Sequence, residues 1–359
     1  MKTIEITTPL GKRIIGPGEP CFIIAEASSN HGRDLSRAKR MIDVAAEAGA
    51  DAVKFQLFKA EDIAVDTDDP RAVVRAKEKA VFVAKDTKLI DLYKANEFPR
   101  EWVAELARYA VAKGILFLAT PFDNAAVDLL ESVETPLYKI ASYEMLDVPL
   151  LRHIAAAKKP IVISTGMADI AEIGQALEVL RQAGNDQVVI LHCRSTYPLP
   201  MADVGLRAMQ AIAEAFDYPV GYSDHSLGIT IPIAAAALGA CVIEKHFMLN
   251  DGVATVDDKF SLNPVELKQM VTAIRDTEAA LGKVEKKPTE KELTERLLGR
   301  RSLWVVKDIA AGDKFTVENV RSLRPGVGLS PLNYDAVIGS VATKAIKSGT
   351  PLSHEDVSK

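Results

Sequence analysis

Short runs of β-branched and aliphatic residues alternate with longer amphipathic stretches over roughly residues 20 to 250. Runs of this length and composition are typical of buried strands. We therefore predict eight strands, at Cys21–Glu26, Ala52–Leu57, Leu116–Thr120, Leu137–Ser142, Ile161–Ser164, Val188–Cys193, Pro219–Ser223 and Val242–His246.

A helix is predicted after each strand, because apolar residues recur there at helical spacing. Eight strand–helix pairs in about 260 residues match the usual size of a closed (β/α)₈ TIM barrel of the α/β class. A doubly wound sheet fits less well, since no G-x-G-x-x-G follows a predicted strand. The helices are expected at Leu35–Ala48, Arg100–Ala112, Asn124–Leu130, Pro149–Ala157, Ile170–Gln182, Leu206–Ala215, Ile229–Leu238 and Pro264–Leu281.

Two segments lie outside the strand–helix alternation. The charged insert Lys59–Asn96 separates the second and third strands and is expected to cover part of the barrel mouth. Residues 284–298 are rich in Lys, Glu and Arg, which indicates a linker between a barrel domain at 1–283 and a small domain at 299–359.

The small domain contains an internal repeat. Lys307–Val320 and Lys344–Val357 share Lys, Ile, Gly, Glu and Val at equivalent positions without a gap. A solenoid needs at least about three repeats. Two copies therefore predict a small, pseudo-symmetric β-rich domain.

Composition narrows the class of protein. With 359 residues, 48% hydrophobic and 26% charged, the chain can bury a full core. Its net charge of −5 provides no general attraction to nucleic acid or to an anionic membrane. No apolar run approaches the roughly 20 residues of a membrane span, and the polar N-terminus lacks a signal-peptide core. Since Cys21, Cys193 and Cys241 lie far apart in apolar stretches, we expect reduced thiols in a cytoplasmic protein.

Every predicted strand ends in or near a polar side chain. In a TIM barrel the reactive groups gather at the carboxyl ends of the strands. We therefore expect one polar cluster at the barrel mouth, formed by Glu26, Lys54, Gln56, Thr120, Lys139, Ser142, Glu144, Ser164, Tyr197, Ser223, His225, Glu244 and His246.

Two histidines stand out within this set. Residues two apart on a strand face the same side, so His225 follows Ser223 and His246 follows Glu244 into the barrel. The histidines are either ordinary core residues or a minimal divalent-metal site with positions open to water and substrate.

Lys54 and Lys139 interrupt apolar strands, where an unpaired lysine costs several kcal/mol to bury. Three interpretations are open. The lysines pair with carboxylates such as Glu26 or Glu244, they bind a small dianion such as phosphate or a phosphorylated enol, or one of them forms a Schiff base.

Ordered motifs then identify a family. The strings IIAEASSNH, AVKFQ, ATPFD, YKIAS-x-E, STGMA, YP-x-P, GYSDHSLGI, IEKHF and D-x-x-FSLNP make the chain similar to the sialic-acid (nonulosonate) synthases, and RRSLWV with RPGVGLSP resembles their antifreeze-like (SAF) domain. This resemblance implies a metal-dependent barrel, a C-terminal SAF domain and a domain-swapped homodimer in which one tail covers the partner's active site. It also implies condensation of phosphoenolpyruvate with an open-chain N-acetylmannosamine-type sugar.

The resemblance implies roles for the polar residues as well. His225 and His246 would bind Mn²⁺ or Mg²⁺, and Glu26 would act as acid/base beside Lys54 and Lys139. The phosphoenolpyruvate site would consist of Lys54, Thr120, Lys139, Ser142, Ser164 and Ser223. The amino sugar would contact Glu26, Gln56, Glu144, Tyr197 and Asp257, and Arg324 would reach its N-acyl group from the partner subunit.

Some positions depart from the N-acetylneuraminate branch. Arg194 replaces a small residue and either touches the sugar or points outward, and Tyr143 replaces a glycine. Asp224 is a candidate to orient a histidine, although alternation turns it to the face opposite His225. The alternative sugars are di-acetamido trideoxyhexoses, as in pseudaminate and legionaminate synthases. A Schiff-base lyase and a carbohydrate-binding protein are more remote alternatives.

Overall fold

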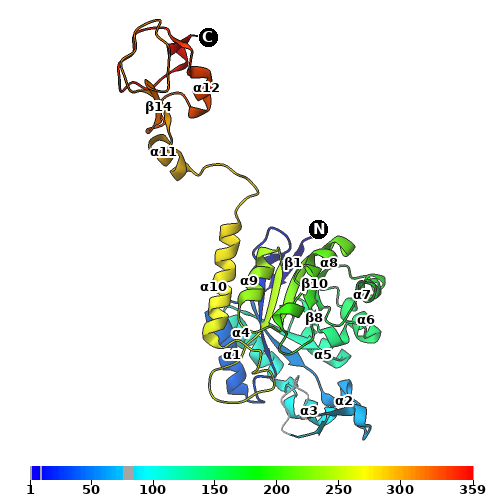
Figure 1. Ribbon diagram of the computed structural model, residues 1–359. Helices are drawn as coiled ribbons and strands as arrows, with labels where there is room; N and C mark the ends of the chain where they lie inside the picture. Colours follow the sequence, from blue (N-terminus) through cyan, green and yellow to red (C-terminus); the bar gives the residue numbers. More distant parts are fainter. Residues whose placement is uncertain (1, 9, 76–84, 359) are drawn as a thin grey trace. The chain divides into compact units, whose positions relative to one another are not determined.

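The computed structural model describes residues 2–8, 10–75 and 85–358. The chain divides into two compact units, Met1–Gly282 and Lys283–Lys359 (Figure 1). Each unit has its own apolar core. In the part of the chain that is described, no helix is both long and apolar enough to cross a membrane.

Eight parallel strands form a nearly closed barrel in the first unit, as the alternation of strands and helices predicted. They are hydrogen-bonded in the order β7-β4-β3-β12-β11-β10-β9-β8, and β7 and β8 lie next to each other where the ring closes. Their bounds are β3 Phe22–Ser28, β4 Ala52–Leu57, β7 Leu116–Pro121, β8 Tyr138–Ile140, β9 Ile161–Ser164, β10 Val188–Cys193, β11 Val220–Asp224 and β12 Val242–His246.

Helices surround this barrel (Figure 1). Several begin at side-chain caps, including Asp34 before α1 and Asn263 before α10, whose oxygens accept the first free backbone N–H groups. The helices are α1 Leu35–Ala48, α4 Val103–Ala112, α5 Asn124–Glu131, α6 Val148–Ala156, α7 Ile170–Gln182, α8 Ala208–Phe216, α9 Thr230–Ala237 and α10 Pro264–Leu281. The helix predicted from Arg100 begins instead as the 3₁₀ turn Arg100–Trp102.

The barrel floor is covered by a hairpin that the sequence analysis missed. Strands β1 (Ile4–Thr8) and β2 (Gly11–Ile15) pair antiparallel. Ile6 and Ile15 pack into the same apolar cluster as Phe22 of β3. The floor of the barrel interior is therefore apolar, and the polar side chains occupy the opposite end.

The insert between β4 and β7 has secondary structure of its own. It contains α2 Ala60–Ile63, the 3₁₀ turn Pro70–Ala72, β5 Val73–Val74, β6 Thr87–Lys88 and α3 Leu89–Asn96. Strands β5 and β6 pair antiparallel.

The second unit is small and β-rich. Residues 284–298, expected as a linker, contain most of helix α11 (Glu290–Gly299), which starts at a capping box on Thr289. The two repeat copies meet at Ile309 and Ile346, which each accept a 2.9 Å backbone hydrogen bond from the other. The remaining elements are β13 Ser302–Val305, β14 Val320–Leu323, α12 Tyr334–Val337, β15 Val341–Ala342 and β16 Val357–Ser358.

Candidate active site

A cavity of about 500 Å³ occupies the carboxyl end of the barrel. Every site residue that the sequence analysis expected in the barrel lines it, whereas Arg324 belongs to the second unit. The expected residues on its wall are Glu26, Lys54, Gln56, Thr120, Lys139, Ser142, Glu144, Ser164, Tyr197, Ser223, His225, His246 and Asp257.

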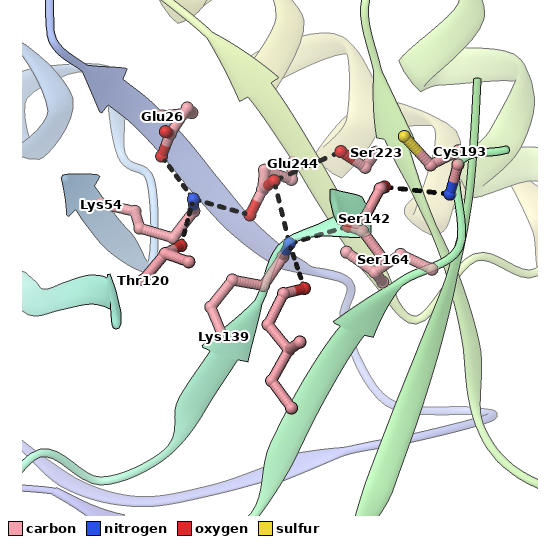
Figure 2. Close-up of polar contacts among 12 residues, drawn as sticks. Glu26, Lys54, Thr120, Lys139, Ser142, Ser164, Cys193, Ser223 and Glu244 are labelled. Atoms are coloured by element: carbon pink, nitrogen blue, oxygen red, sulfur yellow. Dashed lines mark hydrogen bonds and ion pairs between the residues drawn. The ribbon is translucent and has the colours of Figure 1, made fainter. Parts of the chain in front are cut away.

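Lys54 is held between two carboxylates (Figure 2). Its Nζ lies 2.8 Å from Oε2 of Glu26 and 3.6 Å from Oε2 of Glu244, and it donates a 3.0 Å hydrogen bond to Thr120 Oγ1. All of these side chains are buried. The prediction that a buried lysine needs a carboxylate partner is therefore confirmed for Lys54.

Lys139 shares one of these carboxylates. Its Nζ lies 3.4 Å from Oε1 of Glu244 and donates a 2.7 Å hydrogen bond to Ser164 Oγ. Ser223 also donates to Glu244, at 3.2 Å. Glu244 thus bridges the two lysines (Figure 2), a role that strand parity alone did not assign to it.

The charges of this cluster shift one another's pKa values. Burial opposes the charge of Glu244, but Lys139 and Lys54 outweigh it and hold the pKa of that carboxyl well below its usual range. Burial also opposes the charge of Lys54, but Glu244 and Glu26 raise its pKa. The pKa of Lys139 is lowered, chiefly by burial. Two ammonium groups balanced by two carboxylates form a preorganised polar site in a low-dielectric environment.

His225 directly follows β11 and His246 is the last residue of β12, and their ring centroids lie 5.3 Å apart. The carbonyl of Arg194 lies 2.9 Å from Nδ1 of His225, which fixes Nδ1 as the donor and leaves Nε2 as an acceptor. Nδ1 of His246 lies 3.4 Å from Oδ2 of Asp257. Burial lowers the pKa of His225, which favours the neutral imidazole that metals bind.

Few side chains that can bind a metal ion are grouped around these two imidazole rings. Among residues 2–8, 10–75 and 85–358, no three His, Cys, Asp or Glu side chains are grouped to hold a metal ion. Two buried imidazoles at this separation, one with a free Nε2, nonetheless fit a cation that takes its remaining ligands from water or substrate.

Glu144 lies on the 3₁₀ turn Ser142–Glu144, on the wall of the same cavity. Burial raises its pKa to about 7. One of its carboxylate oxygens, Oε2, is buried and makes no hydrogen bond. A carboxyl group with a pKa near neutrality can both give and take a proton at physiological pH.

The insert supplies an apolar side of the cavity that the sequence analysis did not foresee. Ile63, Val74, Leu89, Leu92 and Tyr93 all line it. The charged insert was expected to cover part of the barrel mouth, and hydrophobic residues between its charges line the cavity. The signal was present as apolar residues at helical spacing in LIDLY.

Aromatic rings extend this apolar side. Phe58 contacts Tyr93 and Phe122 edge to face, with centroids 5.5 and 5.6 Å apart. Tyr143 also lines the cavity, although it is 64% exposed. We call Phe58, Phe122 and the five insert residues Ile63, Val74, Leu89, Leu92 and Tyr93 the apolar wall.

The positions of Arg194 and Asp224 decide two other expectations. Arg194 is exposed and does not line the cavity, so its side chain points outward. Asp224 does not contact a histidine ring, because its carboxylate pairs with Lys245 and Ser226 on the opposite face of the strand. The assignment of Asp224 as a direct orienter of a histidine is therefore wrong, as strand alternation requires.

Comparisons with known proteins identify the family. The model of the NeuB family matches residues 41–286, and that of the SAF domain matches residues 300–358. The chain is 41% identical over 346 residues to N,N'-diacetyllegionaminic acid synthase of Legionella pneumophila, covering 95% of this chain and 96% of that one. It is 37% identical to pseudaminic acid synthase of Helicobacter pylori, covering 95% and 99%.

A solved structure is similar as well. N-acetylneuraminic acid synthetase from Leptospira borgpetersenii in complex with citrate matches with a TM-score of 0.70 and 34% identity, covering 82% of this chain and 95% of that one.

Proposed function

The chain belongs to the NeuB family and is an enzyme, and from this premise we propose that it condenses phosphoenolpyruvate with an open-chain, six-carbon amino sugar. In the reaction, water is consumed and phosphate is released, and the product is a nine-carbon 2-keto-3-deoxy acid. The observation that carries the proposal is one cavity holding two buried lysines beside two buried histidines.

The lysine side of the cavity suits phosphoenolpyruvate. Lys54 and Lys139 offer ammonium groups, and Thr120, Ser164 and Ser223 offer hydroxyl groups around them. Charge-assisted hydrogen bonds to phosphate and carboxylate oxygens are the strong ones in a water-poor site. Because both lysines are already ordered by carboxylates, little conformational entropy remains to be lost when the anion binds.

The histidine side suits the aldehyde of the sugar. His225 and His246 would hold a divalent cation, Mn²⁺ or Mg²⁺, which when bound supplies Lewis-acid polarisation of the aldehyde oxygen. The lysines would orient C3 of phosphoenolpyruvate toward the aldehyde carbon, which is C1 of the sugar. The C3–C1 bond then forms, water adds at C2, and the C2–O bond breaks to release phosphate and leave the 2-keto group.

Two carboxyl groups can move the protons of these steps. Glu26 accepts a 3.1 Å hydrogen bond from Gln56 beside Lys54 and is proposed to take the proton of the attacking water. Glu144, with a pKa of about 7, is proposed as a second acid/base at the new sugar hydroxyl.

Two sugar classes remain in competition. One is N-acetylmannosamine, which would make the product N-acetylneuraminate-like. The other is a di-acetamido trideoxyhexose, the substrate class implied for legionaminate or pseudaminate synthesis. The apolar wall favours the second class, because its carbon chain carries a methyl group and a second N-acetyl group where N-acetylmannosamine has hydroxyls, and an unpaired buried hydroxyl is penalised.

A sugar panel tests both the reaction and the sugar. Phosphate release from phosphoenolpyruvate would be measured with N-acetylmannosamine and with each di-acetamido trideoxyhexose, and products would be identified by mass. Release that requires a sugar supports the synthase. A carbohydrate-binding protein would release no phosphate with any of them.

The Schiff-base alternative has one observation in its favour, since the lowered pKa of Lys139 is typical of imine-forming lysines. The ion pair of Lys139 with Glu244 and its hydrogen bond to Ser164 favour anion binding instead. Inactivation by borohydride in the presence of substrate would support the lyase. Loss of activity with EDTA and recovery with Mn²⁺ would reject it.

Arg324 is the remaining site residue. It is exposed in the second unit, next to the cis peptide bond Arg324–Pro325. We propose, on the family resemblance, that it contacts the sugar's N-acyl group in a partner subunit of a domain-swapped homodimer.

A further inference from the structure

A second buried ion pair lies directly behind the two histidines. Nζ of Lys245 lies 2.6 Å from Oδ2 of Asp224, and both side chains are 0% exposed. Asp224 and Lys245 are partners in the register of β11 and β12, and each immediately precedes a histidine. Their side chains face the helices, whereas His225 and His246 face the cavity.

The ion pair also forms hydrogen bonds with Ser226, the residue that follows His225. The Asp224 carboxylate accepts hydrogen bonds of 3.0 Å from both N and Oγ of Ser226. The Lys245 ammonium donates to the carbonyl of Ser226. The residues before and after His225 are therefore both tied to the residue that precedes His246.

We expect this network to add little to the free energy of unfolding, although it buries two charged groups. Burying two charges is expensive, and an apolar pair of similar volume often stabilises a protein as well or better. What the charges add is directionality, because an ammonium group must meet the carboxylate and the carbonyl at fixed positions. The network therefore adds a side-chain constraint to the parallel backbone pairing of Asp224 with Lys245.

The rings themselves are oriented from elsewhere. The Arg194 carbonyl fixes the rotation of His225, and Asp257 lies beside Nδ1 of His246. Neither contact links β11 to β12. Behind the histidines, the Asp224–Lys245–Ser226 network provides a side-chain link between the ends of these two strands.

We propose that Lys245 and Asp224 are positioning residues that fix the spacing of His225 and His246, so that the affinity of this site for a divalent cation depends on them. The inference rests on the cation site of the proposed function. The side chains of Lys245 and Asp224 do not line the cavity. Through them the protein would control how well His225 and His246 bind one cation together.

The test uses the full-length double variant Asp224→Asn with Lys245→Met. Asparagine keeps an acceptor for the Ser226 N–H, and methionine fills the volume of the lysine stem, so the charges and the Lys245 link to Ser226 are lost with little change in packing. Mn²⁺ binding would be measured by isothermal titration calorimetry. We expect binding roughly 10- to 100-fold weaker than in the wild type, the usual effect of losing outer partners of metal ligands.

A matched control separates positioning from folding. Asp51→Asn with Arg275→Met removes a 2.8 Å ion pair that is partly exposed and lies just before β4, at the opposite end of the barrel. This control should bind Mn²⁺ like the wild type. Urea unfolding should show one cooperative transition in both double variants, and steady-state kinetics should show a lower kcat in the site variant with an almost unchanged KM for phosphoenolpyruvate.

The outcomes are distinct. Wild-type Mn²⁺ affinity in a folded Asp224→Asn, Lys245→Met variant would overturn the proposal while leaving the synthase reaction intact. Wild-type protein that binds Mn²⁺ but releases no phosphate with any sugar would overturn the function and leave this proposal standing. Failure of the wild type to bind Mn²⁺ would reject the cation site and this inference together.

If the double variant does not fold, Asp224→Asn with Lys245→Leu gives the same comparison. It also removes both charges and the Lys245 bond to the Ser226 carbonyl, with a more compact apolar side chain in place of the lysine. About tenfold weaker Mn²⁺ binding is then expected, and unchanged binding would again contradict the proposal.

Discussion

The Lys54 ammonium lies 2.8 Å from the Glu26 carboxylate, and both side chains are almost completely buried in the barrel. With Lys139 and Glu244 they form a group of two positive and two negative charges. The carboxylates thus offset the cost of burying the lysines and hold both of them in place. An entering anion meets ammonium groups that are already in place, which is how a protein lowers the reorganisation cost of catalysis.

Lys139→Met should weaken phosphoenolpyruvate binding. The change removes a charged donor while filling the stem volume, and one charge-assisted hydrogen bond corresponds to about 10- to 100-fold in affinity. The KM for phosphoenolpyruvate should rise by that factor and the KM for the sugar should change little, as measured by phosphate release. Lys268→Met, at an exposed position of α10, is the control and should behave as wild type.

His225→Ala and His246→Ala should each abolish turnover without unfolding the protein. Neither ring is part of the ion-pair cluster, and both face the cavity. Activity of the wild type should fall with EDTA and return with Mn²⁺, whereas the variants should stay inactive at any Mn²⁺ concentration. His153→Ala, which removes an outer histidine paired with Asp128, should remain active. Normal turnover in both site variants would refute the cation assignment.

Glu144→Gln should make stability less sensitive to pH. The pKa of Glu144 is raised from 4.5 to about 7 in the folded protein, so the folded state holds its proton more tightly than the unfolded state. This contribution to stability is present below pH 4.5 and is lost as the pH rises through about 7. The free energy of unfolding of Glu144→Gln minus that of the wild type should therefore rise by about 1–3 kcal/mol from pH 5 to pH 8.

Urea unfolding at those two pH values measures this gain. An equal difference between variant and wild type at both values would contradict the raised pKa. The pH–rate profile should depend on the same carboxyl group. The alkaline or acidic limb of that profile near pH 7 should be shifted or lost in Glu144→Gln.

Arg324→Ala should raise the KM for the sugar far more than that for phosphoenolpyruvate. The loss of one guanidinium contact corresponds to about tenfold or more. Arg321→Ala, another exposed arginine in the second unit, is the control. Equal effects of Arg324→Ala on both KM values would contradict its proposed contact with the sugar.

Strand positions were predicted well where the signal is local. The bounds of β4, β9, β10 and β12 match the predicted runs, since buried parallel strands are continuous apolar segments flanked by breaks. The strand predicted at Leu137–Ser142 is shorter, Tyr138–Ile140, because the chain turns at Ser142 to form the 3₁₀ turn that carries Glu144. Turn geometry after a strand depends on its neighbours more than on its own residues.

Elements that pack across large sequence separations were missed. The β1–β2 hairpin is short and half polar, and it is stabilised by apolar contacts with the barrel floor. Helix α11 lies in a segment whose charge density suggested an open linker, although its capping box on Thr289 was visible as T-x-x-E.

The sequence by itself determined which side of each strand the chemistry occupies. Alternation along a strand is local, so Ser223, His225, Glu244 and His246 could be assigned to one face and Asp224 to the other. Only the tertiary structure decided which charges meet. Glu244 lies between Lys54 and Lys139, and Lys245 links Asp224 to Ser226, because closing the barrel sets the register of strands from distant parts of the chain. The stagger between strands from distant parts of the chain is fixed only when the whole ring closes.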